Sequence, residues 1–253
     1  MQILISPAKT INTRLSRQAP YGTKPWFADE AARIALYMAS YSIDRLEGLL
    51  KISPKLAIET YKRIEVFHAD ETPARPALLA YTGMVFQHIA PSDFTDSDFF
   101  YAQKHLRIAS PFYGMLRPLD RIKAYRMEYD VKLPELGGVT MSDFWRSRLA
   151  TPFIEEIRAS GGVLVNLASM DVQPSFDWKR MEKEITVVTP EFKMWRNGKL
   201  ETVTIYAKMA RGEMTRFILK NRIEKSEDLK GFSWEGFSFN AELSNEKRPV
   251  FTN

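Results

Sequence analysis

Cysteine is absent from the 253-residue chain, and histidine is rare. The lack of cysteine excludes disulfides, thiolate nucleophiles, zinc fingers and cysteine-ligated iron-sulfur clusters. The three histidines, His68, His88 and His105, do not have the spacing of a metal-binding motif. No nucleophile and base stand in a recognisable dyad either. We therefore expect no metal site and no cofactor, and the sequence names no catalytic residue.

Long apolar runs and flexible linkers are also missing. No stretch approaches the roughly 18 apolar residues that a membrane helix needs, and the run 1–6 is far too short for a secretory leader. These absences predict a cytoplasmic protein without a membrane partner. The composition, 45% hydrophobic and 26% charged, is that of a globular protein. Because no linker or repeat divides the chain, we expect one domain over residues 1–253.

Helical and extended patterns alternate along the chain. Strands are predicted at 2–5 and 163–167, where short apolar runs indicate burial on both faces. After residue 183 the pattern becomes extended, and Asn197-Gly198 favours a tight hairpin. Helices are predicted over most of 28–68, with a possible break at Ser42 and a new start at Ser53-Pro54. Further helices are predicted at 95–109, at 142–159 with Ser142 as the cap, and at 207–223. The sequence thus predicts an α+β fold, a mixed sheet surrounded by helices.

Polar residues that suit an anion come directly after two of the predicted strands. Ser6, Lys9 and Thr10 come after the strand 2–5, and Asn166 and Ser169 come at the end of the strand 163–167. If these strands are neighbours, the hydroxyl and amine groups converge into a phosphate pocket. The glycines of a P-loop are missing, however. An ordinary surface loop, with Asn166 in a turn and Ser169 as a cap, is the alternative.

Basic residues are concentrated in two segments. Between residues 104 and 126 there are six lysines and arginines against one acid, with aromatic residues among them. On the helix from 207, an advance of about 100° per residue places Lys208, Arg211, Thr215 and Arg222 within an arc of about 60°. Such a ridge suits the phosphate backbone of a nucleic acid. The alternative is a solvated face that is paired with acids such as Glu213.

Four motifs resemble those of the YaaA-type peroxide-stress resistance family. They are Ile5-Ser6-Pro7-Ala8-Lys9-Thr10, His105-Leu106-Arg107 with 113–120, Val165-Asn166-Leu167-Ala168-Ser169, and 206–212 with Arg216-Phe217-Ile218. The resemblance covers essentially the whole chain. It implies a bacterial cytoplasmic protein that protects against hydrogen peroxide, is associated with lowered free iron and DNA repair, and binds double-stranded or branched DNA in a positively charged cleft.

The resemblance also implies a helix-hairpin-helix element, which we expect at the helix 95–109, the hairpin 110–114 and the residues directly after them. This chain departs from the family pattern twice. Gly114 is the one glycine of its hairpin, beside Pro111, and Tyr81-Thr82-Gly83-Met84 lacks the lysine and aspartate that commonly flank the glycine. The first departure shifts the expected phosphate contacts to Lys104, Arg107 and Arg117.

These observations support two hypotheses on function. The leading one is DNA binding with little sequence preference, through these residues: Lys104, Arg107, Gly114, Arg117, Arg121, Lys208, Arg211 and Arg222. Neutralising about five phosphates would give a slope of roughly −4 to −5 for log affinity against log salt. The alternative is an enzyme that acts on a nucleotide or phosphorylated small molecule, in a pocket lined by Ser6, Lys9, Asn166, Lys208 and Arg211. The oligomeric state is left open.

Overall fold

A five-stranded sheet forms the centre of the computed structural model, which describes residues 1–12 and 18–253. Its strand order is β4-β3-β1-β6-β7. The strands are β1 (Gln2–Ile5), β3 (Leu106–Ser110), β4 (Gly114–Leu116), β6 (Val163–Asn166) and β7 (Thr186–Val188). β1 runs parallel to both of its neighbours, with Ile3 opposite Leu106 and Val165, and all four of its residues are buried. The predicted buried strands are therefore confirmed.

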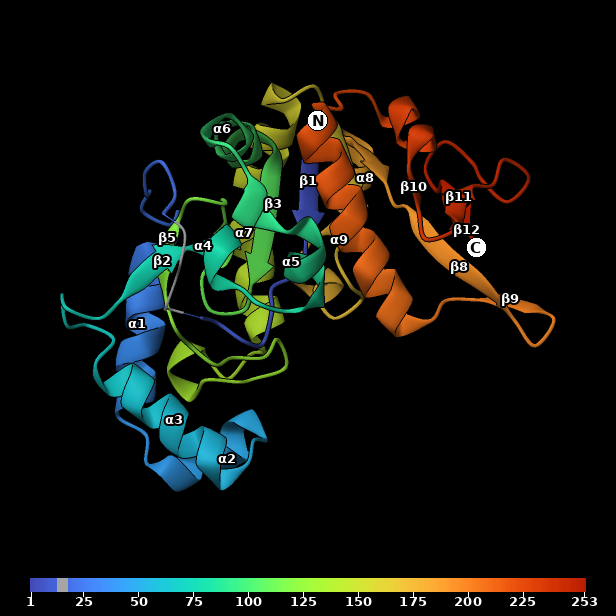
Figure 1. Cartoon of the computed structure of the whole chain (residues 1–253). Helices are drawn as coiled ribbons and strands as arrows, with labels where there is room; N and C mark the ends of the chain where they lie inside the picture. Colours follow the sequence, from blue (N-terminus) through green and yellow to red (C-terminus); the bar gives the residue numbers. More distant parts are fainter. Residues whose placement is uncertain (13–17) are drawn as a thin grey trace.

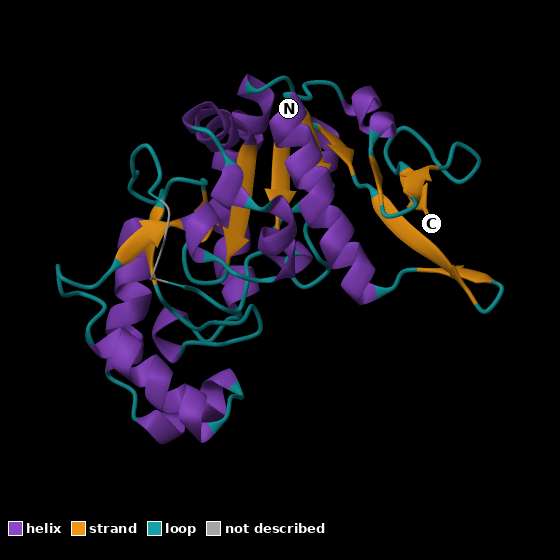
Figure 2. Ribbon diagram, in the orientation of Figure 1, coloured by secondary structure: helices purple, strands orange, loops and turns teal. Residues whose placement is uncertain are grey.

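Two further sheets, one of five strands and one of two, complete the strand content. One has the order β10-β11-β12-β8-β9 and lies to the right of the central sheet in Figures 1 and 2. Its strands are β10 (Ser233–Trp234), β11 (Phe237–Phe239), β12 (Val250–Thr252), β8 (Glu191–Arg196) and β9 (Lys199–Glu201). The β8–β9 hairpin turns at Asn197 and Gly198, both with positive φ, as predicted. The third sheet pairs β2 (Ala74–Pro76) with β5 (Arg121–Lys123).

Three N-terminal helices form an arm at the lower left of Figure 1. They are α1 (Ala28–Ala39), α2 (Ile43–Leu50) and α3 (Pro54–Glu65). The hydroxyls of Ser42 and Ser53 accept hydrogen bonds from the backbone N–H groups of Arg45 and Leu56, which caps the second and third helices. The predicted helix break at Ser42 and the Ser53-Pro54 start are therefore confirmed.

The remaining helices cover the central sheet. They are α4 (Ala77–Ala80), α5 (Met84–Ile89), α6 (Asp96–His105), α7 (Met141–Ala159), α8 (Trp178–Glu184) and α9 (Thr204–Asn221), with short 3-10 turns at Pro91–Asp93, Pro134–Leu136, Gln173–Ser175 and Ser226–Gly231. Helix α9 packs closely on α5 because Gly212 has no side chain: a Cβ there would lie 2.4 Å from the Val85 carbonyl oxygen. In the part of the chain that the structure describes, no helix is long and apolar enough to cross a membrane. The mixed α/β class is confirmed.

The helix-hairpin-helix expectation is wrong for these residues. The predicted helix 95–109 begins as expected, with a Thr95–Asp98 capping box, but it ends at His105. Residues 106–110 form β3, a fully buried strand paired with β1, and a tight turn leads into β4. Apolar spacing over so short a segment fits either structure, and pairing with β1 decides in favour of the strand. The element is therefore a helix followed by a β-hairpin.

Two other helix boundaries differ from the prediction. Thr140, not Ser142, caps α7, and the Ser142 hydroxyl instead donates to the Tyr129 carbonyl. Helix α9 begins at Thr204 and ends at Asn221, so that Arg222 lies beyond it in a left-handed conformation, with φ of 53°. The shift at Arg222 matters for the predicted basic ridge.

Candidate functional site

The loops after β1 and β6 meet at the carboxyl edge of the central sheet. These strands are parallel neighbours, so both chains leave the sheet at the same edge. The Ser6 hydroxyl donates to the Ser169 hydroxyl at 3.0 Å and accepts from the Ser169 backbone N–H at 2.8 Å. The structure thus brings together two of the predicted anion-pocket residues that are more than 160 positions apart.

Two adjoining cavities open beside this meeting point. The larger, of about 720 Å³, lies between the end of α2, the loop 126–130 and the start of α7. The smaller, of about 80 Å³, is lined by Ser6, Lys9 and Ser169. Lys9, Glu128, Tyr129 and Asp171 line both, so the two cavities share a wall. A volume of several hundred cubic ångströms is usual for a ligand site.

The other predicted pocket residues lie elsewhere. The Thr10 hydroxyl accepts from the Thr82 hydroxyl at 2.9 Å. Asn166 accepts from the Ala168 backbone N–H at 3.1 Å, which is the turn that the alternative interpretation expected. Neither of these residues, and neither Lys208 nor Arg211, lines the two cavities. The five-residue pocket of the enzyme hypothesis is therefore not assembled around them.

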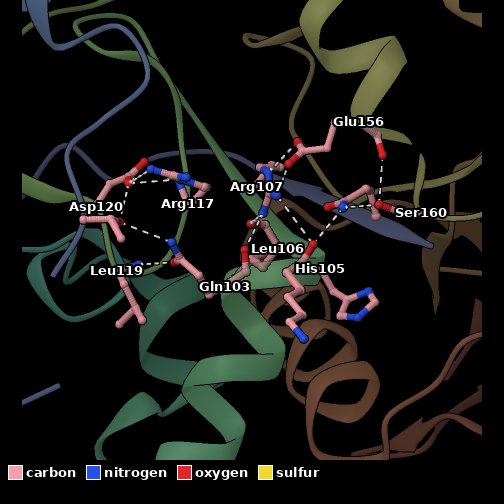
Figure 3. Close-up of polar contacts among 12 residues, drawn as sticks. Gln103, His105, Leu106, Arg107, Arg117, Leu119, Asp120, Glu156 and Ser160 are labelled. Atoms are coloured by element: carbon pink, nitrogen blue, oxygen red, sulfur yellow. Dashed lines mark hydrogen bonds and ion pairs between the residues drawn. The ribbon is translucent and has the colours of Figure 1, made fainter. Parts of the chain in front are cut away.

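Arg107 and Arg117, predicted to contact phosphate, are held by carboxylates inside the protein (Figure 3). Arg107 is 2% exposed, and its Nε donates to Glu156 at 2.7 Å. Arg117 donates through Nη2 to Asp120, which is completely buried, at 2.8 Å. The Arg107 guanidinium is buried and paired, so it is not available to a phosphate. The Arg117 side chain is 24% exposed, but it is paired with the buried Asp120 carboxylate. Both residues are therefore structural in this conformation.

The rest of the 104–126 cluster divides between surface and core. Gly114 is buried in β4 with φ of 71°, and a Cβ there would lie 2.6 Å from the Trp145 ring, so its role is close packing. Lys104 is exposed on the last turn of α6. Arg121 is exposed on β5 and donates to the Ala74 carbonyl at 3.3 Å. These two cations have no carboxylate partner within residues 1–12 and 18–253.

The prediction of an exposed basic ridge on α9 is wrong, because the predicted arc lies on the side of the helix that faces the protein. Thr215 is completely buried, and Arg222, beyond the helix, donates to Asp98 at 2.7 Å. Lys208 is exposed and Arg211 is half-buried. Burial lowers the pKa of the Arg211 guanidinium. Among the described residues, neither Lys208 nor Arg211 has an ion-pair or hydrogen-bond partner for its side chain.

The loop 126–130 contributes residues that the sequence did not indicate. Arg126 and Tyr129 line the large cavity, and the Arg126 Nε–H and the Tyr129 hydroxyl are buried without a hydrogen-bond partner in the described part of the chain. Behind them, the Tyr125 hydroxyl joins those of Tyr81 and Ser110 at 2.6 and 2.9 Å. Burial raises the pKa of Tyr125 to about 12, so the network stays neutral. The segment is irregular, and no periodicity marks it.

A metal centre is not among the features of this edge. Within the described ranges, no group of three or more histidine, cysteine, aspartate or glutamate side chains is placed to hold a metal ion. The chemistry that the edge offers is hydrogen bonding and charge, supplied by serine, tyrosine, lysine, arginine and aspartate side chains.

Comparison with known proteins identifies the relatives of this chain. The family model described as peroxide stress protein YaaA matches residues 1–243. A protein of Bacteroides thetaiotaomicron named UPF0246 protein is 57% identical over 253 residues, which cover 100% of this chain and 98% of the relative. Proteins of the same name from Parabacteroides distasonis and Clostridium beijerinckii are 52% and 40% identical, with at least 97% of each chain covered. The chain belongs to the peroxide stress protein YaaA family.

Proposed function

We propose that this protein, whose family is named for peroxide stress, acts in peroxide stress by binding DNA with little sequence preference. The observation that carries the proposal is the pair Lys208 and Arg211 on α9. They stand three residues apart on one helix, and neither is neutralised by a carboxylate among the described residues. Like charges at this spacing repel each other, and a half-buried guanidinium without a partner costs folding free energy. A bound polyanion removes both costs.

Duplex and branched DNA are the expected partners, since phosphate contacts carry no sequence information. The contact set is smaller than the sequence predicted. Arg107, Arg117 and Arg222 are paired with acids, which leaves Lys104, Arg121, Lys208 and Arg211 as the predicted cations without a carboxylate partner among the described residues. Two to four phosphate contacts give a slope of about −2 to −4 for log affinity against log salt.

Fluorescence anisotropy with a labelled duplex and a labelled four-way junction tests the proposal. We expect the double variant Lys208→Glu with Arg211→Glu to lose at least about tenfold in affinity for both, since two attractive contacts become repulsive. The control is Lys55→Glu with Lys62→Glu, two exposed cations on α3, which makes the same change in net charge. Equal loss in both double variants would mean that only net charge matters, and no loss in the first would refute the proposed contact.

A further inference from the structure

The β8–β9 hairpin projects from the body of the protein, at the lower right of Figures 1 and 2. Residues 191–193 of β8 pair with β12, whereas residues 194–196 pair with β9, which is the edge strand of its sheet. All five residues of the tip, 195–199, are exposed. The tip is therefore a two-stranded ribbon whose side chains are accessible to a partner.

Trp195 on this tip differs from the other four tryptophans of the chain. Its exposed fraction is 64%, against 36% for Trp26 and less for the remaining three. The Trp195 ring has no ring, cation or hydrogen-bond contact among the described residues. Each of the others contacts a second ring or a cation: Trp26, Trp145, Trp178 and Trp234. Covering the Trp195 ring with a partner is favourable, because it removes apolar surface from water.

The charges around the tip are mostly positive. Between residues 192 and 212 there are five lysines and arginines and one acid, Glu201. Lys193 is paired with Glu191 at 2.8 Å, just outside that range. Arg196 and Lys199 lie directly opposite each other across the two strands, a register in which like charges destabilise a hairpin. The Arg196 contact to Glu201, at 4.0 Å on the surface, offsets little of this repulsion, which a bound polyanion would relieve.

The tip is close along the chain to the proposed DNA contact on α9. Leu200 pairs with Trp195 and precedes Lys208 by four residues of extended chain and four of helix. Such a segment spans at most roughly 20 Å. That distance corresponds to about six base pairs of DNA. One DNA molecule can therefore meet both Lys208 and the hairpin.

From this combination we infer that the hairpin tip stacks Trp195 on an unpaired base of DNA. The inference rests on the DNA binding proposed above and adds to it a preference for DNA whose base stack is interrupted. An indole ring stacks on the face of any base, but in a continuous duplex those faces are already covered by neighbouring bases. Arg196 and Lys199, which alternation places on the other face of the ribbon, are positioned for the flanking phosphates.

A membrane surface is the competing partner for an exposed tryptophan near cations. Ile205 and Tyr206, in the first turn of α9, are also 47% and 40% exposed. Membrane-binding surfaces gather several apolar side chains on one face, however, and the residues that follow Trp195 at the tip, 196–199, are polar or glycine. A single exposed ring among polar neighbours suits one base better than a lipid surface.

Anisotropy with three labelled DNAs tests the inference: an unbroken duplex, the same duplex with one bulged nucleotide, and that bulge with an abasic nucleotide. We expect the wild type to bind the bulged base about tenfold more tightly than the abasic bulge. Trp195→Ala should abolish this difference while keeping its affinity for the unbroken duplex. Trp195→Phe should retain most of the difference, because a ring still stacks. Leu36→Ala is the control: it removes a side chain that is 59% exposed on α1, at the other side of Figure 1, and should change nothing.

Tryptophan emission gives a readout that does not depend on affinity. The difference between wild type and Trp195→Phe isolates the emission of Trp195. We expect saturation with the bulged duplex to quench it, since a stacked base quenches indole emission, and saturation with the abasic duplex to leave it unchanged. Vesicles of phosphatidylcholine and phosphatidylglycerol supply the membrane arm. A blue shift on these vesicles without quenching by the bulged duplex overturns the inference in favour of a lipid surface.

Equal affinity of the wild type for the bulged and abasic duplexes also overturns the inference. So does a Trp195→Ala variant that keeps the difference, or one that loses the same affinity for all three DNAs. These results leave DNA binding through Lys208 and Arg211 standing, because that contact is measured on the unbroken duplex. Conversely, unchanged duplex affinity in the Lys208→Glu and Arg211→Glu double variant refutes the α9 contact without touching the role of Trp195. Absence of binding to any of the DNAs refutes both.

Discussion

The two halves of α9 differ in whether carboxylates neutralise their cations. In the C-terminal half, Arg216 donates to Asp93 at 2.9 Å and Lys220 donates to Asp98 at 2.9 Å. In the N-terminal half, Lys208 and Arg211 have no such partners among the described residues. The difference teaches that positive residues on one helix are not equivalent: those opposite acids of the 91–98 segment hold the fold together, and the fold supplies no acid to the other two among the described residues.

The largest expected effect comes from removing the acid that serves the C-terminal half. Asp98 accepts from Lys220, from Arg222 and from the Thr95 backbone N–H that it caps, and its side chain is 8% exposed. Asp98→Ala leaves two cations without their carboxylate acceptor and removes half of the capping box. We therefore expect a loss of about 3 kcal/mol in the free energy of unfolding. Urea denaturation measures it.

The neighbouring exposed acid provides the control for that experiment. Asp96 lies in the same first turn of α6 and is exposed. Asp96→Ala should cost about 0.5 kcal/mol, the size of a helix-terminus effect. If both variants lose the same amount, the C-terminal half is not held by Asp98 and the comparison between the halves fails.

A second, smaller effect has opposite signs in the two halves. Arg216→Met breaks its contacts to the exposed Asp93 and to the Ile89 carbonyl, so we expect a loss of about 1 kcal/mol in stability with little change in DNA affinity. Arg211→Met removes a half-buried cation without a partner in the described chain, so stability should rise by about 1 kcal/mol while DNA affinity falls. Thermal unfolding and anisotropy on the same preparations check both.

The outcome for Arg211→Met decides how that residue is viewed. A stability loss like that of Arg216→Met would show that Arg211 serves the fold and not a partner. Unchanged DNA affinity together with a rise in stability would leave the guanidinium without a purpose in DNA binding.

The smallest expected effect is a pH dependence of stability that, within the comparison of the two halves of α9, comes from the C-terminal half. Burial opposes ionisation of Asp98, but hydrogen bonds from Lys220, the Thr95 backbone N–H and Arg222 outweigh it and hold its pKa well below the usual range. The hydrogen bond from Arg216 likewise lowers the pKa of Asp93. Because these pKa values are lower in the folded than in the unfolded protein, the stabilisation is complete above about pH 5 and declines as the pH falls.

Denaturation at a series of pH values measures this decline. Between pH 5 and pH 3 we expect Asp98 to account for about 1 kcal/mol of the decrease in stability. Asp98→Asn should flatten the profile by that amount, and Lys208→Ala should leave its shape unchanged. A profile of the same steepness in Asp98→Asn would contradict the assignment.

The sequence predicts local structure well where short-range chemistry decides it. The strand at 2–5, the Ser42 and Ser53 caps and the Asn197-Gly198 hairpin depend on residues within a few positions of one another, and the structure has them. The segment 106–109 has helical spacing but forms a strand, because its partner strand, β1, lies a hundred positions away. Periodicity within a short segment carries no information about such a partner.

The candidate site is predictable only in part for the same reason. The parallel placement of two strands lets the sequence anticipate that Ser6 and Ser169 lie at one edge, and they are hydrogen-bonded. The state of each cation depends on distant acids: Glu156 for Arg107 and Asp98 for Arg222. Tyr129, in an irregular loop, belongs to no pattern at all. Charge counts therefore indicate a polyanion partner without showing which charges are free to meet it.

The salt dependence of DNA affinity in a single variant pair tests the central claim most directly. Lys208→Ala with Arg211→Met should reduce the magnitude of the slope of log affinity against log salt by about 2, because each of the two side chains neutralises one phosphate. Arg216→Met with Lys220→Ala should leave the slope as it is in the wild type. Equal slopes in both variants, or a change in the second alone, would contradict the claim that the N-terminal half of α9 meets the DNA backbone.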